Sequence, residues 1–151
     1  IAGFAGEGTR QDLRRMTNAL RSRGPDGEGF HVDQHLHVFL GHRRLAIVDV
    51  ADGRQPMWNE NGTVAVIFNG EIYNHKELRR ALVECGHVFA TSHSDTEVLV
   101  HGYEEWGSEL PSKLNGMFAF AIFDRQRKRL FLARDRFAEK PLYYSHEVYI
   151  I

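Results

Sequence analysis

The sequence has little of several features, and each scarcity excludes a class of protein. Only one of its 151 residues, Cys85, is a cysteine, so an internal disulfide is excluded and a reducing compartment such as the cytoplasm fits best. No apolar run approaches the roughly 20 residues of a membrane-spanning helix, and no signal-peptide pattern opens the chain. The formal net charge is -1 with scattered basic residues, which gives no electrostatic basis for binding nucleic acid or a membrane surface. We expect one cytoplasmic domain with a substantial core.

A polar stretch that follows an apolar run is the most informative local feature. Residues 64–68 are all apolar, which is typical of a strand buried on both faces. The next three residues, 69–71, are Asn, Gly and Glu, and a helix pattern with Leu78 and Leu82 on one face comes after them. An amide, a carboxylate and a glycine that permits close approach to a ligand therefore lie where the chain leaves the core. An isolated Asn-Gly pair is equally a turn signal.

Capping signals predict three helices. The first begins at Thr9, with Asp12 as an acidic variant of the capping box, and stops at a Gly-Pro pair. The second runs up to a glycine at position 86, and Cys85 falls on its apolar face, so we expect this cysteine to be a small buried hydrophobe and not a nucleophile. The third follows the capping-box spacing from Ser94 to Glu97 and ends near residue 107.

Strand patterns fill much of the remaining chain. Residues 1–6 form a small apolar segment, and Asp33-Gln34 could turn a hairpin after residue 30. The run 117–123 is apolar throughout, and residues 130–133 return as its partner. Hairpin-connected strands with segregated helices favour an α+β fold with antiparallel sheets. Strands buried on both faces imply a four-layer αββα sandwich, with two sheets between two layers of helix.

Two groups of residues invite functional hypotheses that local sequence does not decide. His31, His35 and His37 could lie on one strand face, but no cysteine or clustered carboxylate completes a metal site. We therefore expect exposed hairpin histidines and no metal. Arg43 and Arg44 precede an apolar run, which could anchor one guanidinium for a carboxylate ligand. Two solvated surface charges are an equally good interpretation.

The assembled motifs carry more information than any one of them. In chain order they are Arg23-Gly24-Pro25-Asp26-Gly27, Gly41-His42-Arg43-Arg44-Leu45-Ala46-Ile47-Val48-Asp49, Asn69-Gly70-Glu71-Ile72-Tyr73-Asn74-His75, Ser94-Asp95-Thr96-Glu97, Leu114-Asn115-Gly116-Met117-Phe118-Ala119-Phe120 and Ala133-Arg134-Asp135-Arg136-Phe137. Together they resemble the glutaminase domain of class II glutamine amidotransferases, specifically the asparagine synthetase branch. The resemblance covers nearly the whole chain, so residues 1–151 are expected to be one glutaminase domain that is truncated at both ends.

The resemblance implies an N-terminal nucleophile hydrolase fold and a mechanism. An N-terminal cysteine thiolate attacks the side-chain amide of L-glutamine, its own α-amine acts as general base, and ammonia leaves from a thioester. Asn69 and the backbone N–H of Gly70 would form the oxyanion hole. Arg44 would bind the α-carboxylate of glutamine and Asp95 its α-ammonium group. The resemblance completes the substrate pocket with Glu71 and with the backbone of Leu45, Ala46, Ile47 and Val48.

Three departures from the family pattern stand out. The family opens Cys-Gly before the equivalent of Ile1, so the nucleophile would lie two residues before this chain, and the chain as given is expected to be inactive. Cys85 cannot replace it, because the mechanism uses a terminal amine. Ala138 stands where the family carries glycine, and it is expected to add strain if that position has positive φ. The synthetase domain expected downstream, with its ATP and Mg, is absent, whereas the glutaminase domain needs no cofactor.

The leading hypothesis is thus hydrolysis of glutamine for an ATP-dependent amidation, with asparagine formation from aspartate first among the acceptors. The expected partners are glutamine, the C-terminal synthetase domain and a second copy of the chain in a homodimer. One alternative is a nucleophile-less relative that binds glutamine or a partner domain without catalysis. Another keeps the glutaminase but changes the acceptor to an aminosugar, a nucleotide or a peptide.

Overall fold

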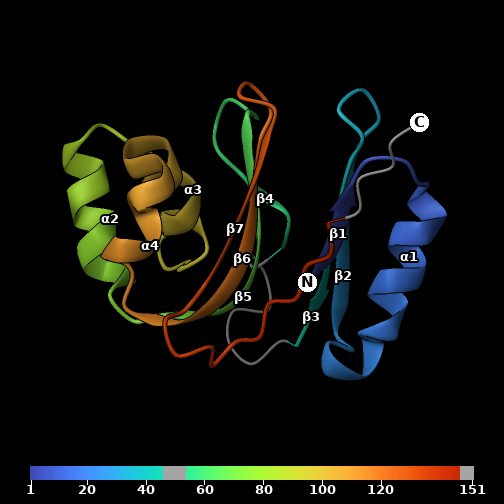
Figure 1. Ribbon diagram of the computed structural model, residues 1–151. Helices are drawn as coiled ribbons and strands as arrows, with labels where there is room; N and C mark the ends of the chain where they lie inside the picture. The colour runs from blue at the N-terminus through green and yellow to red at the C-terminus, as the bar shows by residue number, and fades with distance from the viewer. Residues whose placement is uncertain (46–53, 147–151) are drawn as a thin grey trace.

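The computed structural model describes residues 1–45 and 54–146 and contains four layers (Figure 1). One outer layer is helix α1, Arg10–Ala19, which is followed by the short 3₁₀ helix η1, Arg21–Arg23. The other outer layer holds α2, α3 and α4, which span His75–Glu84, Glu97–Trp106 and Leu110–Lys113, with the 3₁₀ helix η2, Gly107–Glu109, between the last two. Two sheets lie between these layers, so the expected αββα sandwich is confirmed.

Both sheets are antiparallel within the described residues. The first has the order β1-β3-β2, formed by Ala2–Ala5, Val38–Arg44 and Gly27–Asp33. The second has the order β4-β5-β6-β7, formed by Met57–Trp58, Val64–Ile72, Gly116–Asp124 and Arg129–Arg134. The hairpin turn predicted at Asp33-Gln34 joins β2 to β3, and Asp33 accepts hydrogen bonds from the backbone N–H groups of His35 and Leu36.

Two cores hold the layers together, and strand alternation separates them. Alternate residues of β5 pack against α2 and α3, as in the contacts of Phe68 with the cluster that includes Leu82 and Leu99. The intervening residues face the other sheet, where Ile67 packs with Leu40. Because β5 and β6 are covered on both faces, they are apolar almost throughout, as their sequences predict.

The three predicted helices are present, with two errors in detail. The N-cap of α3 is Thr96 and not the predicted Ser94. The capping box at Thr9 forms in full, and α2 and α3 end at glycines with positive φ, Gly86 and Gly107. Cys85, however, is exposed. The prediction of burial was wrong because the helix ends at Glu84, so Cys85 occupies the C-cap position and lies beyond the last turn that the core covers.

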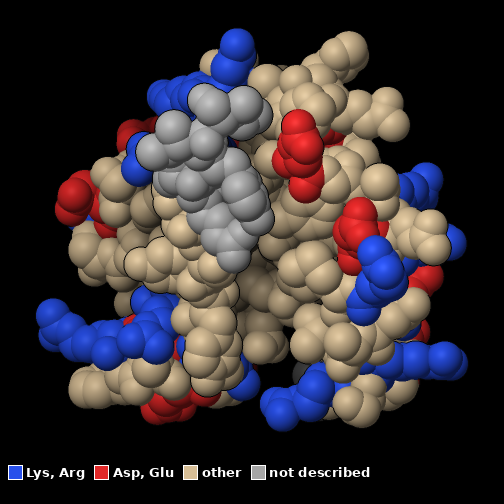
Figure 2. Space-filling view, turned by 45° about the vertical axis from the view of Figure 1, so that its right-hand side comes forward, with Lys and Arg blue, Asp and Glu red and all other residues tan. Residues whose placement is uncertain are grey.

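Charged side chains of both signs are interspersed over the face drawn in Figure 2. The helices of the described residues are at most 10 residues long, and none has the length and apolar character needed to cross a bilayer.

Candidate functional site

Strands β3 and β5 carry the predicted site residues to one end of the layer between the sheets. Leu40 of β3 and Ile67 of β5 both belong to the core of that layer. Because side chains alternate along a strand, Arg44 shares the face of Leu40, and Asn69 and Glu71 share the face of Ile67. The sequence therefore places one guanidinium, one amide and one carboxylate beyond the end of the same apolar core.

Alternation also separates the two adjacent arginines. Arg43 points to the outer face of β3, where its Nε donates to the backbone oxygen of Thr17 in α1 at 3.3 Å and its guanidinium pairs with Glu28 at 2.8 Å. Arg43 therefore fastens α1 to the sheet. Arg44 lies on the inner face of β3. The sequence did not decide which of the two arginines could bind a ligand, and the strand geometry favours Arg44, which faces the layer between the sheets.

His42 lies between Arg44 and the core and was not assigned a role from sequence. It is buried, and its pKa is lowered to about 4, first by burial and then by nearby positive charges that include Arg44. A hydrogen bond to the backbone of Phe68 acts in the opposite direction but is outweighed. The ring is therefore neutral near pH 7 and links β3 to β5 just below the site. The signal that could have identified it is its position two residues before Arg44 on the same strand face.

Asn69, Gly70 and Glu71 are part of β5 and not of the turn that follows it. The strand continues to Ile72, which pairs with Gly116, so it is four residues longer than the apolar run. Asn69 and Glu71 are exposed at this edge, and Gly70 is half-buried. A Cβ on Gly70 would lie 2.0 Å from the backbone oxygen of Met117, so only glycine permits β6 to approach this closely.

Asp95 reaches the same edge from the segment that precedes α3. Its Oδ2 accepts a hydrogen bond from the backbone N–H of Ile72 at 3.1 Å, which fixes the carboxylate next to the end of β5. Burial raises the pKa of Asp95, and the neighbouring charge of Glu71 acts in the same direction, whereas the bond from Ile72 opposes it. A partly buried carboxylate with this perturbation favours a cationic ligand that would restore its charged form.

The capping box predicted at Ser94 forms only in part. The backbone N–H of Glu97 donates to Ser94 Oγ at 3.4 Å, but the Glu97 carboxylate accepts from the backbone N–H groups of Ala90 and Thr91 instead of returning to Ser94. This bonding anchors the loop before α3 and so helps to hold Asp95 in place.

The predicted backbone contributors lie mainly outside the described residues. Leu45 directly follows β3 and is 54% exposed. Ala46, Ile47 and Val48 fall in the segment 46–53, so their predicted part in the pocket stays a prediction. The side chains that the structure brings to one edge are thus those of Arg44, Asn69, Glu71 and Asp95.

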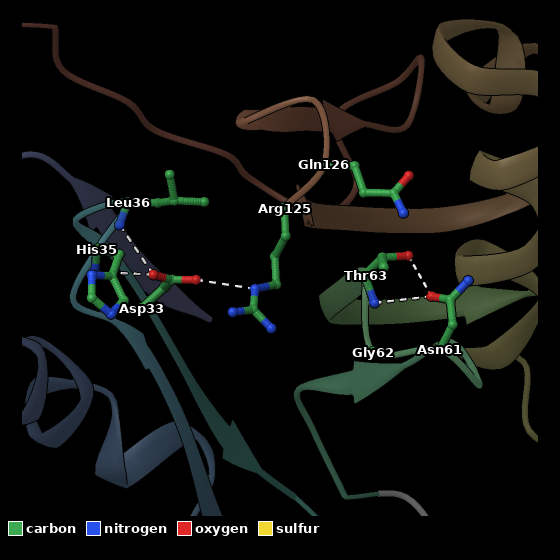
Figure 3. Close-up of a pocket in the computed structure, with 8 residues that line it drawn as sticks. All are labelled: Asp33, His35, Leu36, Asn61, Gly62, Thr63, Arg125 and Gln126. Atoms are coloured by element: carbon green, nitrogen blue, oxygen red, sulfur yellow. Dashed lines mark hydrogen bonds and ion pairs between the residues drawn. The ribbon is translucent and has the colours of Figure 1, made fainter.

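A surface pocket of about 400 Å³ lies at the opposite end of β5, near Val64, and contains none of these residues (Figure 3). Its polar groups largely bond to one another: Arg125 Nε donates to Asp33 Oδ2 at 3.1 Å, and the backbone N–H of Thr63 donates to Asn61 Oδ1 at 3.1 Å. It is lined by Asp33, His35, Leu36, Asn61, Gly62, Thr63, Arg125 and Gln126. These bonds between the residues that line the pocket give its polar groups a structural role, which is to hold neighbouring turns together.

The hairpin histidines do not share one environment. His35 and His37 are exposed, as expected, whereas His31 is partly buried with its ring edge against Trp58 at 4.7 Å between centroids. A second group that contains histidines was not identified from the sequence. Glu60, His87 and His101 converge on one point, although they are far apart in sequence. No spacing pattern links positions 60, 87 and 101, so only the fold reveals them.

Comparisons with known proteins agree on the type of domain. A family model described as a glutamine amidotransferase domain matches residues 1–150. The chain is 47% identical over 140 residues to asparagine synthetase [glutamine-hydrolyzing] 3 of Bacillus subtilis (strain 168), covering 91% of this chain and 22% of that protein. It is 47% identical over 134 residues to asparagine synthetase [glutamine-hydrolyzing] 3 of Arabidopsis thaliana, covering 89% of this chain and 22% of that protein.

A solved structure extends the comparison to the fold. The glutamine phosphoribosylpyrophosphate amidotransferase from B. subtilis, complexed with ADP and GMP, superposes with a TM-score of 0.52 at 30% identity over 66% of this chain and 23% of that one. This likeness confirms the expected fold, that of the N-terminal nucleophile hydrolases. The chain spans about a fifth of the length of the curated relatives reported above.

Proposed function

We propose, from the fact that this chain belongs to the glutamine amidotransferase domain family, that the edge formed by Arg44, Asn69, Gly70, Glu71 and Asp95 binds L-glutamine and hydrolyses its side-chain amide. The observation that carries the proposal is the convergence of oppositely charged groups at the end of one apolar layer. Arg44 offers a planar cation for an α-carboxylate, and Asp95 offers a carboxylate for an α-ammonium group. A free amino acid carries both charges on one carbon atom.

Asn69 and Gly70 are proposed to stabilise the oxyanion that forms on the amide group of the substrate. The Asn69 side chain and the Gly70 N–H can donate to negative charge that develops on the amide oxygen, and Gly70 allows backbone to approach that oxygen without a side chain in the way. Glu71 stands next to Asp95 and adds a second carboxylate near the ammonium group. Leu45 and the backbone of Ala46, Ile47 and Val48 are proposed to close the pocket over the substrate.

The register of β1 supports a nucleophile at the expected position. Ala2 pairs with Gly41 in antiparallel register, so each step back along β1 is a step forward along β3. A residue two positions before Ile1 would therefore lie opposite Arg44. It would also share the face of Ile1, which packs into the layer between the sheets. An N-terminal cysteine there would have its thiolate and its α-amine beside the proposed glutamine site, as the mechanism requires.

The released ammonia is proposed to serve an ATP-dependent amidation, with aspartate as the first candidate acceptor. The support is the likeness to two glutamine-hydrolysing asparagine synthetases, each several times longer than this chain. ATP and Mg would bind in a C-terminal synthetase domain, and the full-length protein is proposed to act in the cytoplasm, as a homodimer. Other acceptors remain an alternative, which the products formed from aspartate, aminosugars, nucleotides and peptides would distinguish.

The decisive experiment uses the two neighbouring arginines of the full-length protein. Arg44→Lys keeps the charge but loses the planar fork, so the KM for glutamine in glutamate release should rise at least about tenfold. Asn69→Ala should instead lower kcat by about 10²–10³-fold. Arg43→Lys is the matched control, because Arg43 contacts α1 and Glu28, and its KM should stay near that of the parent. Equal effects of the two arginine variants would refute the assignment.

The non-catalytic alternative requires a separate measurement. Calorimetry with glutamine and a glutamate-release assay on the full-length protein distinguish binding from hydrolysis, and N-terminal sequencing with intact mass identifies the first residue. Binding without release from a mature chain that has no N-terminal cysteine would establish the nucleophile-less relative. Release from a chain that begins with cysteine would exclude it.

A further inference from the structure

A cluster of histidines and carboxylates lies in the helical layer, away from the proposed glutamine site. His101 of α3 is almost fully buried, and His87 follows the end of α2. Glu60 comes from the turn before β5, and its carboxylate and the two rings each offer one atom within 4.8 Å of the others. Glu104, one turn along α3, joins them: its Oε2 lies 3.2 Å from His101 Nδ1 and 4.0 Å from His87 Nδ1.

The separations are close to those of a coordination shell. His101 Nδ1 also lies 3.7 Å from Glu60 Oε2. Around a tetrahedral Zn²⁺ with bonds of about 2.0–2.2 Å, neighbouring ligand atoms are about 3.3–3.6 Å apart. Three of the measured pairs, at 3.2, 3.7 and 4.0 Å, depart from this by only a few tenths of an ångström. The side chain of Glu60 is 53% exposed, so it has room to rotate toward an ion.

The second nitrogen of each ring is held by a different carboxylate. His101 Nε2 lies 3.7 Å from Glu97 Oε1, and His87 Nε2 lies 3.4 Å from Glu105 Oε2. Each imidazole thus directs Nδ1 at the common point and Nε2 at an outer carboxylate, which is the arrangement that orients metal-binding histidines in proteins. An ordinary buried ion pair does not require both rings to have this same orientation.

The carboxylate of Glu104 is oriented in a comparable way. Its Oε1 accepts a hydrogen bond from Asn59 Nδ2 at 2.7 Å, which leaves Oε2 directed at the histidines. Asn59 is itself fixed, because its Oδ1 accepts from the backbone N–H groups of Thr63 and Val64 at 2.9 and 3.0 Å. The carboxylate of Glu104 is therefore positioned before any ion arrives.

We propose that Glu60, His87, His101 and Glu104 form a binding site for a divalent transition-metal ion, best suited to Zn²⁺. Two imidazole nitrogens and two carboxylate oxygens match the ligand preference of Zn²⁺, whereas Mg²⁺ and Ca²⁺ prefer shells of oxygen alone. The ion ties together the turn before β5, the segment after α2 and the middle of α3. It has a structural role, because the proposed glutamine-binding edge lies at the other end of β5.

Zn²⁺ titration of the full-length protein, stripped of metal with a chelator, tests the site. Isothermal calorimetry and elemental analysis after dialysis should find that the parent binds one additional Zn²⁺ per chain, with high affinity, compared with His87→Gln. Saturating Zn²⁺ should raise the thermal midpoint by several degrees in the parent but not in His87→Gln. His35→Gln, which removes an exposed histidine from the β2–β3 turn, is the matched control and should behave as the parent does.

Glu60→Gln provides a second variant in case His87→Gln disturbs folding, since Glu60 lies in an exposed turn. It should weaken Zn²⁺ binding at least tenfold while the midpoint without metal stays unchanged. Equal Zn²⁺ stoichiometry in the parent, His87→Gln and Glu60→Gln would overturn the proposal, as would the absence of a bound equivalent in the parent. Neither readout depends on glutamine hydrolysis, so the result is independent of the proposed function.

Discussion

Replacing Ala138 with glycine should stabilise the protein. Ala138 has φ of 58° in the loop after β7, so the strain expected if this position had positive φ is present. Its backbone N–H donates to the backbone oxygen of Asp135 at 3.2 Å. The Asp135 carboxylate accepts from the N–H groups of Glu139 and Lys140, both at 2.9 Å. These bonds on either side hold residue 138 in a conformation that its Cβ disfavours.

The size of the gain follows from two opposing contributions. An L-residue in the left-handed region costs about 1–2 kcal/mol relative to the right-handed one. Glycine removes that cost but gives the unfolded chain more conformational entropy, which takes back about 0.4–1 kcal/mol. The middle values of these two ranges differ by about 0.8 kcal/mol, so we expect Ala138→Gly to raise the free energy of unfolding by about 0.5–1 kcal/mol. For a domain of this size the thermal midpoint should rise by about 1–4 °C.

Ala81→Gly is the matched control, because the same change of residue is made in the exposed middle of α2. There the backbone is helical, so the substitution should lower the free energy of unfolding by about 1 kcal/mol. Urea denaturation followed by circular dichroism measures both variants. If Ala138→Gly were neutral or destabilising while Ala81→Gly lost the expected amount, the strain at Ala138 would be refuted.

Three further outcomes follow from the structure. Gly70→Ala should lose about 3 kcal/mol or more of stability in urea denaturation, because its Cβ would meet the Met117 oxygen, whereas Gly62→Ala, with open space around it, should lose only about 1 kcal/mol. Asp135→Asn should lose about 1.5–3 kcal/mol at neutral pH, since the amide cannot accept all three backbone N–H groups that the carboxylate accepts. Burial alone would raise the pKa of Asp135, but those bonds lower it overall. The stabilisation by the carboxylate is therefore complete above about pH 4 and is lost as pH falls through the lowered pKa. The unfolding curves of the parent and Asp135→Asn should accordingly converge in acid. Burial raises the pKa of Asp95, so the KM for glutamine in the full-length protein should rise as pH falls through this raised pKa. Asp95→Asn should abolish this dependence, and a pH-independent KM in the parent would contradict the assignment.

Much of the fold could be predicted because local signals and tertiary structure agree. The apolar runs of β5 and β6 predict strands covered on both faces, and Thr9 with Asp12 predicts the start of α1 correctly. Cys85 shows the limit of this reasoning, because a helical wheel continues a face past the residue where the helix ends. The end of β5 shows another: pairing with β6 extends the strand through Asn69 and Glu71, which have low strand propensity, because the partner strand supplies hydrogen bonds that the local sequence does not encode.

The site divides in the same way. Motif resemblance selects Arg44, Asn69, Gly70, Glu71 and Asp95, and alternation along β3 then separates Arg44 from Arg43 on physical grounds. The roles of these residues stay predictions until the kinetics are measured. Long-range groups leave no local pattern, so the convergence of Glu60, His87 and His101 could not be read from the sequence.

The thin apolar layer between the sheets has a mechanical consequence. Among the described residues no strand pairing joins the two sheets, so the distance from Arg44 to Asn69 depends largely on how side chains such as Ala121 and Ile67 fill that layer. A bulkier residue at Ala121 would slide or spread the sheets while leaving the hydrogen bonds of each sheet intact. The site residues can therefore lose their alignment in a protein whose secondary structure and circular dichroism are unchanged. The packing of this layer thus sets the distance between the site residues on β3 and those on β5.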